Sequence, residues 1–373
     1  MAMSRRDALR ALSAVSTGAV SAPFASTMID ADQSATQLPA EGVFDLGDLR
    51  LASGTTLPNA KIGYKTHGTL NAAKNNVILY PTPYPAQHGD IEWLIGPGKA
   101  LDPSKYFIIV LDQLGNGLSS SPSNTPAPFD RMRFPTVTIH DDVAAQHRLV
   151  TSGFGIERIA LVVGWSMGAQ QTFQWAVSHP GMVERIAPFC GTAKTTPHNW
   201  VFLQSLYTAL TTDPAWMDGN YKEQPARGMR AFAHIYASWA PSQPFYKKEL
   251  YKPLGFATLE DYLAGFWEKR YARRDANNLL ILLRKWQLND VGRSNGFGGS
   301  LERALGSITA KAVVMAGQTD LYFTPDDIEA DASHIRGARY IVIPSLWGHM
   351  AGSGLNDRDT QFIDTQLKAL LAS

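Results

Sequence analysis

The sequence contains one cysteine, Cys190, among its 373 residues. A single cysteine excludes an intrachain disulfide and any cysteine-based zinc cluster. Neither sign of charge is in excess, since the formal net charge is +1. Charged residues of both signs together make up only 18% of the chain. Since no basic stripe is present to hold a polyanion, we expect no nucleic-acid partner.

Long hydrophobic runs are missing as well. Near the N-terminus, Arg5-Arg6 precedes an Ala/Ser-rich run, Ala8–Ala25, which is too short and too polar to span a membrane. This pattern is typical of a twin-arginine export signal, with small residues near the expected cleavage point at Ala22 or Ala25. The alternative is a disordered extension on a cytoplasmic protein. We therefore exclude residues 1–30 from the fold and expect a periplasmic or secreted protein without membrane insertion.

Short apolar runs alternate with helical patterns through much of the chain. Most of these runs lack polar alternation, which is typical of strands buried on both faces of a parallel sheet. Helical patterns over residues 141–152 and 168–178 lie between strands, so the sequence predicts an α/β fold with a mostly parallel sheet flanked by helices. The expected strands are Asn76–Pro81, Tyr106–Asp112, Arg158–Gly164, Arg185–Cys190, Lys311–Gly317 and Arg339–Pro344.

The alternation stops between about residues 198 and 300, where Trp, Tyr, Phe and Leu recur at helical spacing. Thr258-Leu-Glu-Asp261 resembles a capping box that opens a helix through Trp267. We interpret residues 198–300 as an inserted helical lid. It separates the two parts of the core, residues 40–197 and 301–373.

The stretch Val162–Gln171, VVGWSMGAQQ, contains a serine between two glycines where a predicted strand meets a predicted helix. This context predicts a nucleophile elbow at Ser166, because bulkier residues at positions 164 and 168 would collide in the sharp turn. The first N–H groups of the following helix favour a developing oxyanion. We expect Ser166 to be the nucleophile and the N–H of Met167 to be one oxyanion donor.

A serine needs a base and an orienting acid, which follow it in the order acid, then histidine, in this arrangement. His349 follows the predicted strand 339–344 and Asp320 follows the strand 311–317, so both lie where ligand chemistry collects in α/β sheets. Asp326 and Asp327 instead suit a helix N-terminus. We expect His349 as the base and Asp320 as the acid. Among the other histidines after the serine are His198, His234 and His334.

A second oxyanion donor is expected from the loop Pro81-Thr-Pro-Tyr-Pro85. Prolines have no N–H, so only Thr82 and Tyr84 can donate there, and we favour Tyr84. Gly115-Asn-Gly117 lacks the third glycine of a dinucleotide loop. His140-Asp141-Asp142 has no second ligand cluster at suitable spacing. We therefore expect no cofactor and no metal.

With these residues placed, the chain resembles the homoserine O-acetyltransferase family, a branch of the α/β-hydrolase fold. The resemblance covers most of the chain after about residue 45. It implies a helical lid over a deep active site, a homodimer formed through the lid, and Ser166, Asp320 and His349 as nucleophile, acid and base. The matching stretches are Leu94–Asp102, Phe134–Ile139 with Asp141, Gly164–Gly168, Asp275–Asn277 and Leu288–Val291.

The chain departs from the family pattern at three places. Trp165 replaces a glycine before the serine, and Thr82-Pro-Tyr-Pro-Ala86 replaces the usual oxyanion loop. Tyr207 takes the place of an arginine that holds the homoserine carboxylate, and tyrosine cannot supply that bidentate clamp. Asp290, which would meet the substrate amine, is retained. We expect Trp165, Tyr207 and Asp290 to contact a substrate other than homoserine.

Acetyl-CoA is a cytoplasmic donor, so an exported enzyme with this machinery would transfer its acyl group to water. The sequence therefore predicts a serine hydrolase that cleaves an ester, or an amide, of a small to medium and largely apolar substrate. The alternative is a CoA-dependent O-acyltransferase acting on a small alcohol. A non-catalytic binding protein on the same scaffold is a third hypothesis, disfavoured by the order of the three residues.

Overall fold

The computed structural model describes residues 38–294 and 296–373. The export signal expected in residues 1–30 lies outside the described residues. No helix in the described ranges is long and apolar enough to cross a membrane.

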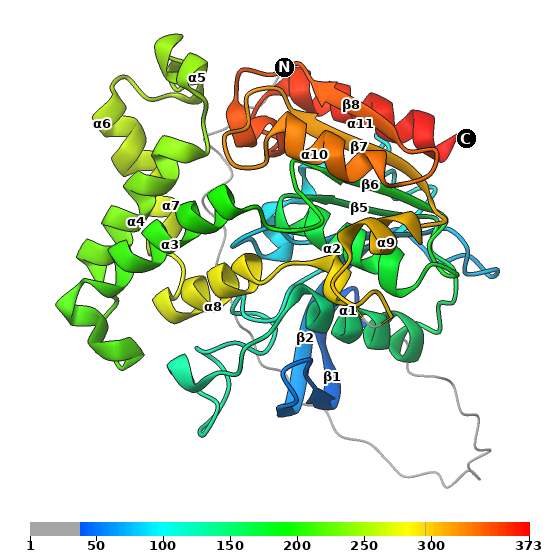
Figure 1. Ribbon diagram of the computed structural model, residues 1–373, viewed down its shortest axis with the longest axis horizontal. Helices are drawn as coiled ribbons and strands as arrows, with labels where there is room; N and C mark the ends of the chain where they lie inside the picture. Colours follow the sequence, from blue (N-terminus) through cyan, green and yellow to red (C-terminus); the bar gives the residue numbers. More distant parts are fainter. Residues whose placement is uncertain (1–37, 295) are drawn as a thin grey trace, which may run out of the picture. The chain divides into compact units, whose positions relative to one another are not determined.

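One mixed sheet forms the centre of the described structure (Figure 1). Its spatial order is β1-β2-β4-β3-β5-β6-β7-β8. β1 and β2 pair antiparallel with each other, and β2 pairs antiparallel with β4, whereas every later pair is parallel. The strands are β1 Glu41–Arg50, β2 Thr56–His67, β3 Val77–Pro81, β4 Phe107–Leu111, β5 Leu161–Trp165, β6 Arg185–Phe189, β7 Lys311–Gly317 and β8 Arg339–Ile343.

The predicted mostly parallel sheet is confirmed, and six of its strands lie where the apolar runs indicated. In β3, β4 and β5 every residue is buried, as expected of strands covered on both faces. Successive residues point to opposite faces, so Leu79 packs in one apolar cluster and Ile78 in the other. Because the strands from β4 to β8 in the spatial order run parallel, their carboxyl ends lie at the same edge of the sheet.

The sequence analysis missed the antiparallel strands β1 and β2. Their burial alternates between exposed and covered positions, and β1 is shifted in register at Gly47. A half-exposed antiparallel strand has no continuous apolar run, so its pattern is weaker than that of a strand buried on both faces.

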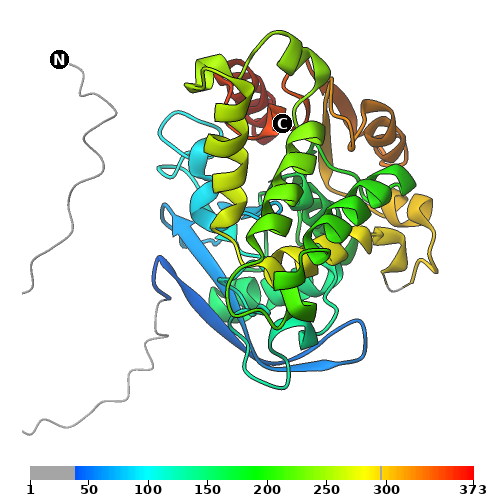
Figure 2. The same cartoon turned by 90° about the vertical axis from the view of Figure 1, so that its left-hand side faces the viewer.

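Helices cover the sheet and form the predicted insertion. Figure 1 shows α3 to α8 grouped on one side of the molecule, and Figure 2 shows the same group facing the viewer. The helices are α1 Ile139–Arg148, α2 Met167–Ser178, α3 Pro197–Thr211, α4 Ala226–Trp239, α5 Gln243–Lys247, α6 Leu259–Tyr262, α7 Lys269–Ala272, α8 Ala276–Gln287, α9 Leu301–Gly306, α10 Pro325–Ser333 and α11 Asp357–Leu371. We call the segment from α3 to α8 the insertion, because it lies between β6 and β7.

Side-chain caps fix where the inserted helices begin. The Thr196 side chain accepts a hydrogen bond from the N–H of Asn199 at the start of α3, and Asp275 accepts from Asn278 at the start of α8. The cap predicted at Thr258 is present, since its hydroxyl accepts from the N–H of Asp261. The helix it opens continues through a π-helical segment, Leu263–Glu268.

Candidate active site

The serine elbow lies where β5 meets α2. Ser166 has φ 59° and ψ −123°, a strained conformation for a residue other than glycine. A Cβ added to Gly164 would lie 2.3 Å from the carbonyl carbon of Gly168, and one added to Gly168 would lie 2.5 Å from the carbonyl oxygen of Pro81. Close backbone approach therefore requires both glycines, and the predicted turn is observed.

Asp320 and His349 form a close pair at the same edge of the sheet. Asp320 Oδ2 lies 2.7 Å from His349 Nδ1, and both residues are almost fully buried. The second carboxylate oxygen accepts hydrogen bonds from the N–H groups of Tyr322 and Phe323. Because the carboxylate is held from both sides, it fixes the imidazole with Nδ1 facing Asp320. This leaves Nε2 as the nitrogen free to exchange a proton.

The loop that carries His349 is held by the insertion. The His349 N–H donates to the carbonyl of Ala240 at 2.8 Å, just after α4. Gly348 has φ 63°, and a Cβ there would lie 2.5 Å from the same carbonyl oxygen. The Ser242 hydroxyl donates to the carbonyl of Leu346. The insertion therefore contributes to the position of the imidazole as well as to its cover.

Trp165, the residue that precedes Ser166, contacts the ring of His349. The Trp165 indole stacks on the His349 ring with centroids 5.1 Å apart, and its Nε1 donates to the His349 carbonyl at 3.2 Å. Within the described residues, no hydrogen bond joins the Ser166 hydroxyl to the imidazole. Such bonds are often long in unliganded hydrolases and tighten when substrate binds.

The expected oxyanion donors lie on two segments that touch each other. Met167 is the first residue of α2, so its N–H has no partner within the helix. The N–H of Thr82 donates to the Leu111 carbonyl at 2.9 Å, so it is not available to an oxyanion. Of the two candidates in the loop, this leaves Tyr84, whose N–H has no acceptor among the described residues.

Aromatic side chains of the insertion pack on the expected oxyanion loop. Tyr84 stacks on Tyr236 with ring centroids 6.0 Å apart and contacts Phe232 and Trp286. Tyr322, from the loop after β7, lies 4.5 Å from the His349 ring by centroids. Burial raises the pKa of the Tyr84 and Tyr322 phenols, so both stay neutral at physiological pH. The His349 ring is thus packed among aromatic side chains, and both Ser166 and His349 are buried.

Known proteins share this arrangement of strand, turn and helix. The sequence profile of the α/β-hydrolase fold matches residues 87–352. The chain belongs to the α/β-hydrolase family. An ethyl acetate hydrolase of Pseudomonas veronii is 43% identical over 333 residues, covering 88% of this chain and 94% of that protein.

Two further comparisons refine the position of this α/β-hydrolase within its family. The crystal structure of an acetylester hydrolase from Corynebacterium glutamicum superposes with a TM-score of 0.87 at 40% identity, covering 89% of this chain and 96% of that one. A homoserine O-acetyltransferase of Chlorobaculum parvum is 32% identical, covering 83% of this chain and 89% of that protein. The predicted relationship to the homoserine O-acetyltransferases is confirmed.

The three residues expected to contact substrate lie in three different surroundings. Trp165 packs on His349, and its ring also fills the space beside Gly352, where a Cβ would lie 2.2 Å from it. Tyr207, on α3, is half-buried at the margin of the core. No contact between Tyr207 and the Ser166, Asp320 or His349 side chains is found in the described ranges.

Asp290 is held by structural partners. Its carboxylate lies 3.0 Å from Lys194 Nζ and accepts a hydrogen bond from the N–H of Gly292, which caps a short 3₁₀ turn. It lines a cavity of about 570 Å³ together with His140 and Gln174, and this cavity does not include Ser166. The structure therefore does not bring Asp290 to the serine, and its contact with substrate stays a prediction.

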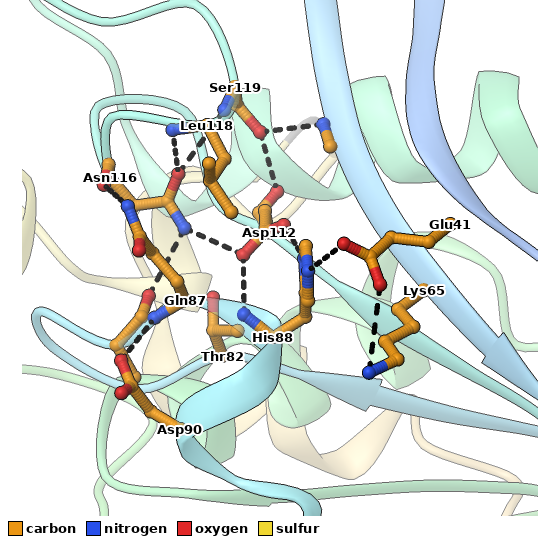
Figure 3. Close-up of polar contacts among 12 residues, drawn as sticks. Glu41, Lys65, Thr82, Gln87, His88, Asp90, Asp112, Asn116, Leu118 and Ser119 are labelled. Carbon is orange, nitrogen blue, oxygen red and sulfur yellow. Dashed lines mark hydrogen bonds and ion pairs between the residues drawn. The ribbon is translucent and has the colours of Figure 1, made fainter. Parts of the chain in front are cut away.

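A second histidine–aspartate pair, drawn in Figure 3, holds the segment that follows the oxyanion loop. His88 Nδ1 lies 2.6 Å from Asp112 Oδ2, and the His88 N–H donates to the other oxygen of that carboxylate. Asn116 also donates to Asp112 and to the Ala86 carbonyl. The hydrogen bond to Asp112 raises the pKa of His88, and burial only partly opposes this. His88 Nε2 faces Glu41, at 3.3 Å.

Sequence reasoning also missed the residues that hold the start of the oxyanion loop, at Thr82 and Pro83. Gln113 and Gln171 both donate to the Thr82 carbonyl, at 3.2 and 2.9 Å, and the buried Lys285 donates to Gln113. A lysine inside the apolar run LLILLRKW and two adjacent glutamines after the elbow were the available signals. Buried polar residues in apolar runs point to specific partners, but they do not name them.

Proposed function

We propose that this α/β-hydrolase cleaves carboxylic esters with a small acyl group through an acyl-enzyme on Ser166. The Asp320–His349 pair beside a serine elbow carries the proposal, because it supplies an oriented base next to a strained nucleophile. The ester-cleaving activities named for relatives at 40% identity or more support the same chemistry.

The proposed reaction proceeds in two acyl transfers. Ser166 Oγ attacks the ester carbonyl while His349 Nε2 takes its proton, and the N–H groups of Met167 and Tyr84 stabilise the oxyanion. His349 then gives the proton to the departing alcohol. Water attacks the acyl-enzyme with the same base, and the carboxylic acid leaves. Asp320 stabilises the imidazolium in both steps.

The enclosed site favours an acyl group of acetyl size. Ser166 and His349 are each only 2% exposed, and the Tyr322 ring of the β7 loop lies against His349 and packs in turn on Trp286 of the insertion. A long acyl chain would have to displace these rings. We therefore expect acetyl esters of short alcohols to be the preferred class.

Hydrolysis of ethyl acetate and p-nitrophenyl acetate tests this proposal, with Ser166→Ala as the control. Turnover by the wild-type protein that the variant lacks supports it. Substrate cleavage at the same rate in both proteins would contradict the nucleophile assignment. The physiological alcohol can then be sought with a series of acetyl esters.

The alternative is acyl transfer from CoA to a small alcohol, favoured by the relationship to the homoserine O-acetyltransferases. Tyr207 in place of the expected arginine argues against homoserine as the acceptor. Incubation with acetyl-CoA and homoserine distinguishes the two reactions. Formation of O-acetylhomoserine faster than free acetate would favour the transferase.

Export through the twin-arginine route and a dimer through the insertion remain predictions. Cell fractionation with N-terminal sequencing tests the first, and an uncleaved cytoplasmic protein would contradict it. Light scattering on the purified protein tests the second.

A further inference from the structure

A buried lysine of the insertion reaches into the core close to the oxyanion loop. Lys285, on α8, is fully buried, and Nζ lies 2.6 Å from Asp142 Oδ2 on α1. It also donates to the Leu114 carbonyl at 2.6 Å and to Gln113 Oε1 at 3.3 Å. These three contacts use all three donors of an ammonium group. The reaction proposed above gives Lys285 no part.

Gln113 connects this lysine to the oxyanion loop. Its side-chain NH₂ donates to the carbonyls of Thr82 and Pro83, each at 3.2 Å. An amide can turn over and exchange its oxygen and nitrogen, but Lys285 only donates and therefore requires the Gln113 oxygen. In the reversed orientation the oxygen would face two carbonyl oxygens and the NH₂ would face the ammonium. Lys285 thus reinforces the orientation in which the NH₂ of Gln113 meets the two carbonyls of the loop.

A second chain of hydrogen bonds also ends on the carbonyl of Thr82. The Trp175 indole donates to Gln146, and Gln146 donates to Gln171, at 2.7 and 2.6 Å. Gln171 then donates to the carbonyls of Thr82 and Met167 at 2.9 and 3.1 Å. Like the lysine, an indole N–H can only donate, so it fixes the direction of this chain too. Both chains are buried.

We propose that Lys285 is a positioning residue for the oxyanion hole, acting through Gln113 on the Thr82–Pro83 backbone and so on the N–H of Tyr84. The inference rests on the proposed ester hydrolysis and adds a residue to it. Its consequence is that the insertion sets the rate of acyl transfer as well as covering the site. An oxyanion donor displaced by about 1 Å loses much of its effect, because preorganisation is what makes it effective.

A simpler role for Lys285 would be to neutralise Asp142, and variants of both residues separate the two roles. Lys285→Met leaves a buried carboxylate unpaired, so we expect the unfolding temperature to fall by about 5–10 °C. We also expect kcat for p-nitrophenyl acetate to fall about 10- to 100-fold, with KM changed less than about threefold. Asp142→Asn keeps the lysine on Gln113, so its kcat should stay within about threefold of wild type.

The double variant Asp142→Asn/Lys285→Met gives the decisive result. It removes both charges, so the unfolding temperature should recover most of the loss. Its kcat should stay as low as that of Lys285→Met, because Gln113 still lacks its donor. Wild-type kcat in the double variant would overturn the proposal and leave Lys285 with a charge-pairing role only.

Gln113→Met tests the same link with the ion pair intact, and therefore does not depend on whether the lysine variants fold. We expect a similar loss in kcat at nearly unchanged unfolding temperature, and unchanged kcat would also overturn the proposal. Lys368→Met, which breaks an exposed pair with Asp364, is the matched control. If the wild-type protein cleaves no ester, the proposed function itself fails. If the wild-type protein cleaves esters and these variants keep wild-type kcat, only the Lys285 inference fails.

Discussion

The two histidine–aspartate pairs of this hydrolase have nearly the same geometry and different surroundings. The Nδ1–carboxylate distance is 2.7 Å for His349–Asp320 and 2.6 Å for His88–Asp112. His88 Nε2 faces the carboxylate of Glu41, whereas the His349 ring lies among Trp165, Tyr322 and Phe323 beside the serine elbow. The comparison teaches that a short His–Asp contact does not identify a base. What the other ring nitrogen faces decides the role.

Replacing each histidine by glutamine should separate the pairs most strongly. His349→Gln removes the proposed base, so we expect kcat for acetyl ester cleavage to fall by about 10⁴-fold or more. His88→Gln should lower kcat by less than about tenfold, because it loosens only the segment that follows the oxyanion loop. Steady-state kinetics on both variants measure the difference. Equal losses would contradict the assignment of the base.

The aspartates should differ in the same direction with a smaller contrast. Asp320→Asn leaves His349 in the wrong tautomer, and we expect a loss in kcat of about 10³- to 10⁴-fold with little change in KM. Asp112→Asn should mainly lower stability, by about 1–3 kcal/mol, since Asp112 accepts from His88 and Asn116. Chemical denaturation beside the kinetics tests this, and a stable but inactive Asp112→Asn would be evidence against it.

The pH dependence of stability gives a third contrast. The pKa of His88 is raised by Asp112, so the protonated form stabilises the fold. Its contribution should be complete below about pH 6.5, the pKa in the unfolded chain, and should be lost as pH rises through the folded-state pKa. We therefore expect the stability difference between wild type and His88→Gln to be larger at pH 5.5 than at pH 9.

His179 supplies a control of opposite sign for this measurement. Burial lowers the pKa of His179 to about 4. His179 therefore binds a proton near pH 6.5 in the unfolded chain but only near pH 4 in the folded protein. Stability relative to His179→Gln should fall as pH falls through this window. The same trend for both histidines would contradict the two directions.

The smallest effect is expected at Glu41, the partner of His88 Nε2. Its side chain is 57% exposed, so solvent screens its attraction for the imidazole. Glu41→Gln should shift the unfolding temperature by less than about 1 °C and leave kcat unchanged. A larger shift in a thermal melt would mean that Glu41, and not Asp112, holds His88 in place.

Much of the fold and the order of the three site residues could be predicted, because continuous apolar runs and the turn at Ser166 are local features. Asp320 and His349 could be proposed because each follows such a run, and the structure shows that they contact each other. Lys311–Gly317 is a strand within the predicted bounds. β1 and β2 were missed because half-exposed antiparallel strands carry a weaker pattern.

The supports of the oxyanion loop could not be predicted, because their contacts join distant parts of the chain. Gln113 meets Thr82 across 31 residues, and Lys285 meets Gln113 across 172. Nothing in a single sequence tells which buried amide a lysine will meet. The second histidine–aspartate pair was missed for another reason, since His88 precedes the serine and so falls outside the expected order.

Trapping the acyl-enzyme is the most direct test of the account. The protein would be mixed with p-nitrophenyl acetate, quenched in acid within the first turnovers, digested and analysed by mass spectrometry. We predict an acetyl group on the peptide that contains Ser166, and no such adduct in Ser166→Ala. Full turnover with no acetyl group on Ser166, or with the group on another residue, would contradict the central claim.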